Sequence, residues 1–214
     1  MISARGPWIH PGSDGGCAAG PARGFSLVEA LSSVAILGIL VLVSVPLVAA
    51  TVARERLHAA SLETALAFRG LRQRAVTEGC SYGLRFVASG GGWSYSLYRD
   101  GNGNGIRTAD ILSGRDELVE GPEDSGRRFE GIRAGLPLTP VPQIPPGSGV
   151  IPSPADPVKF GNGNLVSFSP SGSISGGTLY LTDGTRVGAV VVFGPTGRIR
   201  LQRYDPEAGW RGGF

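Results

Sequence analysis

The sequence predicts an α+β protein in which a long N-terminal helix packs on a C-terminal head of antiparallel β-sheet. Three observations lead to this prediction. A charge-free apolar segment lies near the N-terminus, helical periodicity continues beyond it, and alternating patterns begin after Gly79. The composition agrees, because 35 glycines and 16 prolines suit a turn-rich head, whereas a hydrophobic fraction of 41% excludes a disordered chain.

The apolar segment has the length of a membrane span. Residues 30–53 carry no formal charge, and a helix of that length extends roughly 36 Å, enough to cross a bilayer core. A secretory signal peptide has a shorter apolar core with small residues after it, whereas here the small residue Gly24 comes before it. Glu29 lies at the start of this segment. A carboxylate in hydrocarbon is energetically costly, so this residue must be either cleaved from the span or given a function there.

The residues around Glu29 explain why an acid stands there. "GFSLVE", residues 24–29, closely resembles the processing signature of type IV prepilins and type II secretion pseudopilins. The resemblance implies that a prepilin peptidase removes residues 1–24 as a leader, cutting after Gly24, and methylates the new amino terminus on Phe25. It also implies that Glu29 pairs with the free amino terminus of a neighbouring subunit, so that the carboxylate is satisfied only in the assembled filament. The alternative is an ordinary anchor whose Glu29 reaches the headgroups.

The helix is expected to have two parts, a membrane-spanning and assembly half over residues 25–53 and an amphipathic half over residues 54–79. Pro46 lies in the first half, where pilins often carry a proline that bends or locally melts the helix. In the second half, apolar or small residues recur at three- and four-residue steps and should pack on the head: Leu57, Ala60, Thr64, Phe68, Leu71 and Ala75. Gly79 is the expected stop. Arg5 and Arg23 precede the span, which fits a cytoplasmic leader, an inner-membrane anchor with a single pass, and a periplasmic head.

Residues 80–214 are expected to form the β-rich head. "SYGLRFV" (81–87) and "WSYSLYR" (93–99) alternate and are separated by a glycine-rich turn, which predicts a hairpin. Further strands are expected at Arg127–Ala134, Leu165–Ser169, Thr178–Thr182, Val187–Phe193 and Arg198–Tyr204. Prolines recur through residues 136–157, so this stretch is expected to be a loop.

The loop after the first hairpin has the beginning of a calcium-binding pattern. Asp100, Asn102 and Asn104 alternate and a glycine follows, as Ca²⁺ ligation requires. Ile111 stands where a bidentate acid belongs, and Asp110 comes one residue early. A weak Ca²⁺ site and a Gly/Asn-rich turn therefore remain as alternatives, and we favour the turn.

The C-terminal part of the sequence indicates a subfamily within the pilin-like proteins. Residues 165–204, "LVSFSPSGSISGGTLYLTDGTRVGAVVVFGPTGRIRLQRY", resemble the ending of H-type pseudopilins (GspH) and FimT-type minor pilins. Some competence-associated FimT proteins bind DNA through a GRxR motif on the last strands, and the resemblance extends that role to Arg198 and Arg200, with Arg203 nearby. Alternation places Arg198 and Arg200 on one face, where both guanidinium groups can meet phosphates. The alternative is a solvated strand whose arginines discourage edge pairing.

No catalytic constellation is found, and we do not expect an enzyme. The two histidines have no nucleophile positioned beside them, and no phosphate-binding loop or metalloprotease motif occurs. No cofactor is expected apart from weakly bound Ca²⁺. The expected partners are the prepilin peptidase, other pseudopilins or pilins contacted through the N-terminal helix, the inner membrane, and DNA as an alternative. Three functions follow: a type II secretion pseudopilin, a DNA-binding minor pilin, and an anchored β domain outside any filament.

Overall fold

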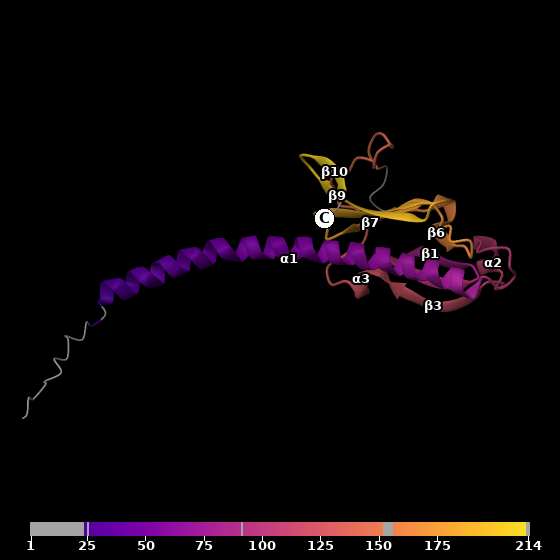
Figure 1. Cartoon of the computed structure of the whole chain (residues 1–214). Coiled ribbons are helices and arrows are strands. Elements are labelled where there is room, and N and C mark those ends of the chain that lie inside the picture. The colour runs from indigo at the N-terminus through magenta and orange to yellow at the C-terminus, as the bar shows by residue number, and fades with distance from the viewer. Residues whose placement is uncertain (1–23, 25, 91, 152–155, 213–214) are drawn as a thin grey trace, which may run out of the picture. The chain divides into compact units, whose positions relative to one another are not determined.

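The computed structural model describes residues 24, 26–90, 92–151 and 156–212. The chain divides into two units, Met1–Pro46 and Leu47–Phe214, and each is described by itself. Helix α1, Leu27–Glu78, contributes to both, and the strands all belong to the second unit, the head (Figure 1). The α+β prediction, with a long apolar helix followed by antiparallel β-sheet, is therefore confirmed.

In the first unit, the described part of α1 is a surface of aliphatic side chains. Leu27, Leu42 and Leu47, the last just inside the second unit, are 77%, 77% and 69% exposed in the single chain. Among the described residues, α1 is the helix that is long and apolar enough to cross a membrane by length and composition. Side chains of this kind require lipid or protein around them, because water is an unfavourable solvent for such a surface.

In the second unit, α1 packs one face on the head. Leu57, Ala60, Phe68 and Ala75 are buried, as their spacing predicted. The helix ends at Glu78, and Gly79 has a φ of 62°, a left-handed conformation that glycine adopts without steric cost. This end directs the chain into the first strand of the sheet.

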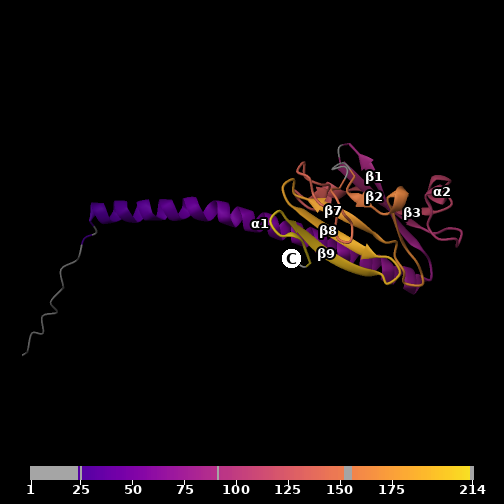
Figure 2. The same cartoon turned by 90° about the horizontal axis from the view of Figure 1, so that it is seen from above.

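Two antiparallel sheets form the rest of the head. Sheet A has the strand order β3-β2-β1-β6 and sheet B the order β10-β9-β8-β7-β4, with β5 also on β7. The bounds in sheet A are β1 Tyr82–Ser89, β2 Gly92–Arg99, β3 Glu117–Asp124 and β6 Leu165–Phe168. Those in sheet B are β4 Arg133–Ala134, β5 Val158–Lys159, β7 Gly177–Thr182, β8 Val187–Phe193, β9 Arg198–Asp205 and β10 Gly209–Gly212. Short helices lie between strands: α2 Thr108–Leu112, α3 Ser125–Arg128 and the 3₁₀ turn η1 Gly161–Gly163. Figure 2 shows β7, β8 and β9 running alongside one another over the helix.

The head has two apolar clusters, one on each face of sheet B. The larger cluster lies between α1 and the sheets, where the Phe68 ring meets Phe160 edge-on at 6.2 Å between centroids and Phe168 at 5.8 Å. The smaller cluster joins Tyr180 and Trp210 to side chains of the proline-rich loop, and the Trp210 indole N–H donates to the Pro142 carbonyl at 2.7 Å. The loop is thereby held on the outer face of sheet B.

The expected strand at Arg127–Ala134 is wrong in its first half. Residues 125–128 form α3 because the Asp124 carboxylate accepts from the Gly126 N–H at 2.8 Å and caps a helical turn. Only Arg133–Ala134 pairs, as β4. Strands β3, β5 and β10 were not predicted, whereas the other six expected strands are confirmed within one or two residues.

Candidate assembly segment and binding surfaces

The N-terminal segment builds its first helical turn around Glu29. Helix α1 starts at Leu27, and the Ala30 N–H donates to the Ser26 carbonyl at 3.0 Å. The hydroxyls of Ser32 and Ser33 donate to the main-chain carbonyl of Glu29 at 2.9 and 2.8 Å. The acid therefore lies in the first turn, where the helix dipole favours a negative charge. Gly24 is exposed, and Phe25 lies outside the described residues.

The Glu29 carboxylate is exposed and has no hydrogen-bond or ion-pair partner among the described residues. Its helical neighbours Val28 and Leu31 are 71% and 61% exposed, so it stands on an aliphatic surface. In hydrocarbon, an ionised carboxylate without a partner is strongly unfavourable. Wherever this surface is embedded in lipid, pairing with a cation or access to the headgroups would relieve that cost.

Helix α1 is assigned as continuous through residue 46, and the boundary between the two units falls directly after it. Proline lacks an N–H, so the Leu42 carbonyl, four residues earlier, has no intrahelical donor. A bend or melted turn at Pro46 remains a prediction.

A comparison with known families supports the interpretation of this segment. Residues 21–45 match the family model of the prokaryotic N-terminal methylation motif. The chain carries a prepilin-type N-terminus. This match supports a type IV pilin-like protein or pseudopilin, and it implies processing by a prepilin peptidase and assembly with pilins. In the comparisons with curated proteins and with solved structures, nothing matched the chain.

The arginines of β9 divide between the two faces of sheet B. Arg198 and Arg200 are exposed and alternate with Ile199, which is only 9% exposed and belongs to the larger cluster. They therefore share the outer face, as the sequence predicted. The Arg200 guanidinium lies over the Phe193 ring, 5.1 Å from its centroid, and Phe193 is the cross-strand partner of Arg198.

Arg203 belongs to the opposite face. The register of β8 with β9 is continuous from Arg198 to Arg203, so odd-numbered residues of β9 point to the side of Ile199. Arg203 is the cross-strand partner of Arg211 in β10, and Asp205 lies two residues after Arg203 along β9. The Glu207 N–H lowers the pKa of the Asp205 carboxyl, and both arginines lower it further. The three arginines that are close in sequence thus form no single surface.

The Asp100 loop is closed by its own hydrogen bonds. One oxygen of Asp100 accepts from the N–H groups of Asn102 and Gly103 at 3.1 and 2.8 Å, and the other from Gly105 at 2.7 Å. The Asn102 side-chain oxygen accepts from the Asn104 N–H at 3.1 Å. These oxygens are the expected Ca²⁺ ligands, and in this arrangement they face backbone donors. The calcium site remains a prediction, and the geometry agrees with the turn alternative.

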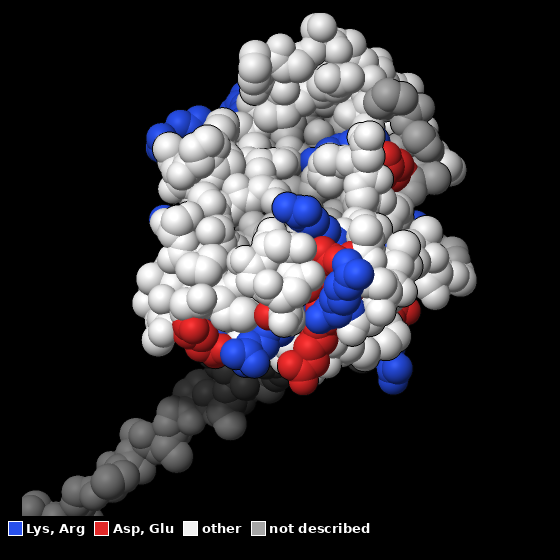
Figure 3. All heavy atoms as spheres, turned by 90° about the vertical axis from the view of Figure 1, so that its right-hand side faces the viewer, with Lys and Arg blue, Asp and Glu red and all other residues white. Residues whose placement is uncertain are grey.

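Asp110 lies in α2, and its partners complete the loop. It accepts from the Asn104 amide at 3.2 Å and from Arg115 at 3.2 Å, and these two donors, Asn104 first, lower the pKa of its carboxyl. Asp116, which the sequence did not single out, is buried and accepts from the N–H groups of Gly101 and Arg107. Across the described part of the chain, no three acids, histidines or cysteines gather as metal ligands. Figure 3 views the end of the head where α2 and β3 lie, and acidic and basic side chains are interspersed there.

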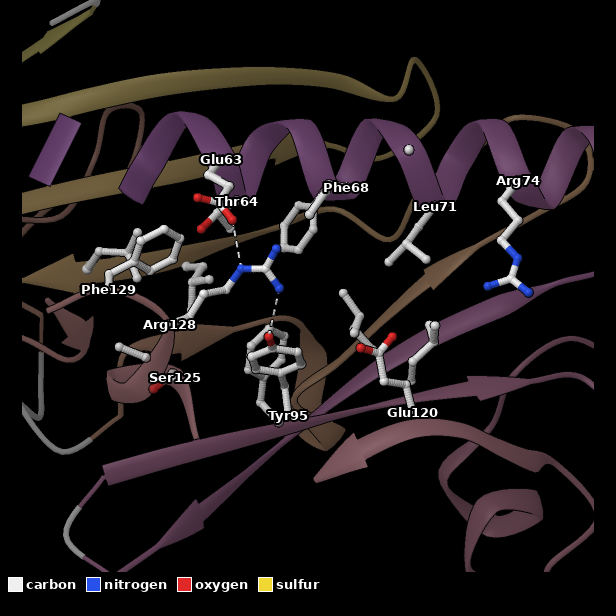
Figure 4. Close-up of a pocket in the computed structure, with 18 residues that line it drawn as sticks. Glu63, Thr64, Phe68, Leu71, Arg74, Tyr95, Glu120, Ser125, Arg128 and Phe129 are labelled. Carbon is white, nitrogen blue, oxygen red and sulfur yellow. Dashed lines mark hydrogen bonds and ion pairs between the residues drawn. The ribbon is translucent and has the colours of Figure 1, made fainter. Parts of the chain in front are cut away.

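The arrangement around Arg128 has no counterpart in the sequence motifs. Its Nε donates to Glu63 of α1 at 2.8 Å and its Nη1 to the Tyr95 hydroxyl of β2 at 3.3 Å (Figure 4). The Glu63 carboxylate, and then Tyr95, raise the pKa of the guanidinium above its ordinary value. Burial raises the pKa of Tyr95, and the Glu123 carboxylate adds to this effect. The three side chains come from residues 32 or more positions apart, so no local motif announces them.

Proposed function

We propose that the protein is a minor pseudopilin of the H-type, an assembly subunit of a type II secretion pseudopilus. The observation that carries the proposal is Glu29, a carboxylate without a partner on an aliphatic helix that carries the methylation motif. After cleavage at Gly24–Phe25, the chain waits in the inner membrane with its head in the periplasm. Assembly then brings the amino terminus of a neighbouring subunit to Glu29 and the aliphatic helices together, which satisfies the charge and sets the register.

Intact mass tests the first step. Cells with a prepilin peptidase should yield a chain that lacks residues 1–24 and carries one methyl group on Phe25, whereas cells without the peptidase should yield the uncut chain. An uncut chain in both strains refutes the pseudopilin and leaves an anchored β domain.

Substitution of Glu29 tests the second step. Glu29→Gln should still be cleaved, because the glycine and its flanking residues remain, but it should fail to restore export of folded periplasmic substrates in a deletion strain. Ser33→Ala is the matched control, since it changes a polar group of the same helix turn and should restore export. Full export by Glu29→Gln contradicts the register role.

A second function, DNA binding by a FimT-type minor pilin, is favoured by Arg198 and Arg200 together with Phe193 on the neighbouring strand. Two exposed guanidinium groups and an aromatic ring on one sheet face suit phosphates and stacked bases. The double variant Arg198→Gln, Arg200→Gln should abolish transformation while export is retained. Arg203→Gln, which changes an arginine of the opposite face, is the control and should leave transformation intact. Equal loss in both variants points to a nonspecific charge effect and rejects this function.

A further inference from the structure

The head contains a cavity of about 310 Å³ between the second half of α1 and the two sheets. Protein interiors are packed nearly as closely as organic crystals, so an apolar space of this size within a head is a candidate for ligand binding. Its walls include four aromatic rings and several leucines, among them Phe68, Leu71, Phe86, Tyr95, Leu97 and Phe129. In Figure 4, Phe68 and Leu71 reach from the helix towards the sheet across this space.

Polar groups of α3 and α1 lie at one side of the cavity. Arg128 spans the distance between helix and sheet, held by Glu63 and Tyr95. The Ser125 hydroxyl is shielded from solvent, lines the cavity, and has no hydrogen-bond partner among the residues that the structure describes. The guanidinium is a charged donor that an acceptor group on a ligand in the cavity can use, and the Ser125 hydroxyl is a separate donor on the cavity wall.

We propose that this cavity binds a single-chain carboxylic acid of about eight carbons, with its alkyl chain between Phe68 and the leucines and its carboxylate on Arg128. At about 30 Å³ for each non-hydrogen atom, the volume holds about ten such atoms. It is too small for a phospholipid with two chains. Carboxylates bind arginine through paired, charge-assisted hydrogen bonds. The ligand carboxylate takes the place of Glu63, whose side chain is 48% exposed and free to turn into solvent.

The binding site is independent of the proposed assembly role, because its residues all lie in the head. We would test it with the full chain purified in detergent and two photoreactive probes, octanoic acid and octanol, each carrying a diazirine near the end of the alkyl chain. After irradiation, peptide mapping should place the octanoic acid label on residues 63–71 and on β1 or β2. Label on residues 27–46 measures nonspecific insertion near the aliphatic helix and serves as the internal reference.

Blocking the cavity should remove the specific label. Gly70 lines the cavity, and a Cβ built on it meets nothing within 4 Å, so Gly70→Phe can attach its side chain there, and its ring should fill cavity space. We expect labelling of residues 63–71 to fall at least about tenfold relative to residues 27–46. Leu62→Phe adds a ring on the same helix outside the cavity lining and should change nothing. Thermal melting checks the fold of both, and Ala67→Leu is a second blocking variant.

A separate set of variants tests the contact between the ligand carboxylate and Arg128. Arg128→Gln should lower labelling by the acid about tenfold and leave labelling by the alcohol unchanged, since only the acid uses the guanidinium. Glu63→Gln should raise labelling by the acid, because it removes the competing carboxylate. Cavity labelling that survives both blocking variants, or that is equal for acid and alcohol in the parent chain, overturns the proposal. So does the absence of label on the cavity peptides, which is the result expected if a side chain of a partner protein occupies the space instead.

Discussion

Phe68 is the side chain on which we expect the stability of the head to depend most. It is 1% exposed and packs edge-on against Phe168 of β6 in sheet A and against Phe160, which follows β5 of sheet B. Replacement of a buried phenylalanine by alanine typically destabilises by about 3–5 kcal/mol, and each aromatic pair contributes about 0.5–1.5 kcal/mol of this. The neighbouring cavity already limits the contacts of one side of the ring. We therefore expect Phe68→Ala to lower the free energy of unfolding of the head by about 4 kcal/mol.

Urea unfolding of the full chain in micelles measures this loss. Two reporter chains that keep only Trp93, in β2, or only Trp210, in β10, follow sheet A and sheet B separately by fluorescence. The two midpoints should coincide in the parent and shift together in Phe68→Ala, because one ring contacts both halves of the core. Leu66→Ala, at a side chain that is 52% exposed on the same helix, should change stability by no more than about 0.5 kcal/mol. If Phe68→Ala lowers the free energy of unfolding by less than about 1 kcal/mol, or if the two reporters shift separately, Phe68 does not join the two sheets into one core.

Three further expectations concern the loops of the head. Asp100→Ala removes an acceptor of three backbone N–H groups and should destabilise by about 1–3 kcal/mol in urea unfolding, with Asn102→Ala costing less; a rise in melting temperature on adding Ca²⁺ to the parent, lost in Asp100→Ala, establishes the calcium site instead. Trp210→Phe keeps an aromatic ring, though a smaller one, and removes the hydrogen bond to Pro142, so limited proteolysis should cut residues 136–151 faster than in the parent; an unchanged rate contradicts the anchoring role. Because the folded pKa of Asp110 lies below its ordinary value of 3.8, its contribution to stability is present above that value and is lost as the pH falls through the folded pKa; Asp110→Asn should therefore show a shallower decline in melting temperature below about pH 4, and an identical decline contradicts it.

The parts of the fold that the sequence predicted are those in which periodicity and burial agree. The buried stripe of α1 and the strands β1 and β2 show regular repeats in the sequence, and β8 is a short continuous apolar run, so pattern alone located them. Strand β3 was missed because Glu117–Asp124 contains acids, a glycine and a proline, which read as a loop. It forms because β2 offers a complete partner, and its position at the sheet edge tolerates both the exposed acids and Pro122.

The candidate sites also differ in how far the sequence predicts them. The methylation motif is a run of neighbouring residues, so it was readable from the sequence, and the family model agrees with it. The arginines of β9 are also neighbours, but period-two alternation separates Arg203 from Arg198 and Arg200, which grouping by sequence distance ignored. The cavity draws its walls from α1, β1, β2 and β7. A space bounded by side chains from across the whole head has no local pattern, and only the packed structure reveals it.

The unsatisfied features of the two units have different physical consequences. In the first unit, Glu29 lies on an aliphatic surface and has no hydrogen-bond or ion-pair partner among the described residues. Under the proposed assembly role, the amino terminus of a second subunit supplies that partner, so the pairing depends on subunit concentration. In the head, by contrast, Arg128 and Glu63 already satisfy each other, and a ligand has to displace an existing pair. Loss of Glu63 should thus strengthen ligand binding, whereas loss of Glu29 should only weaken assembly, so the two acids are expected to respond in opposite directions to the same Glu→Gln change.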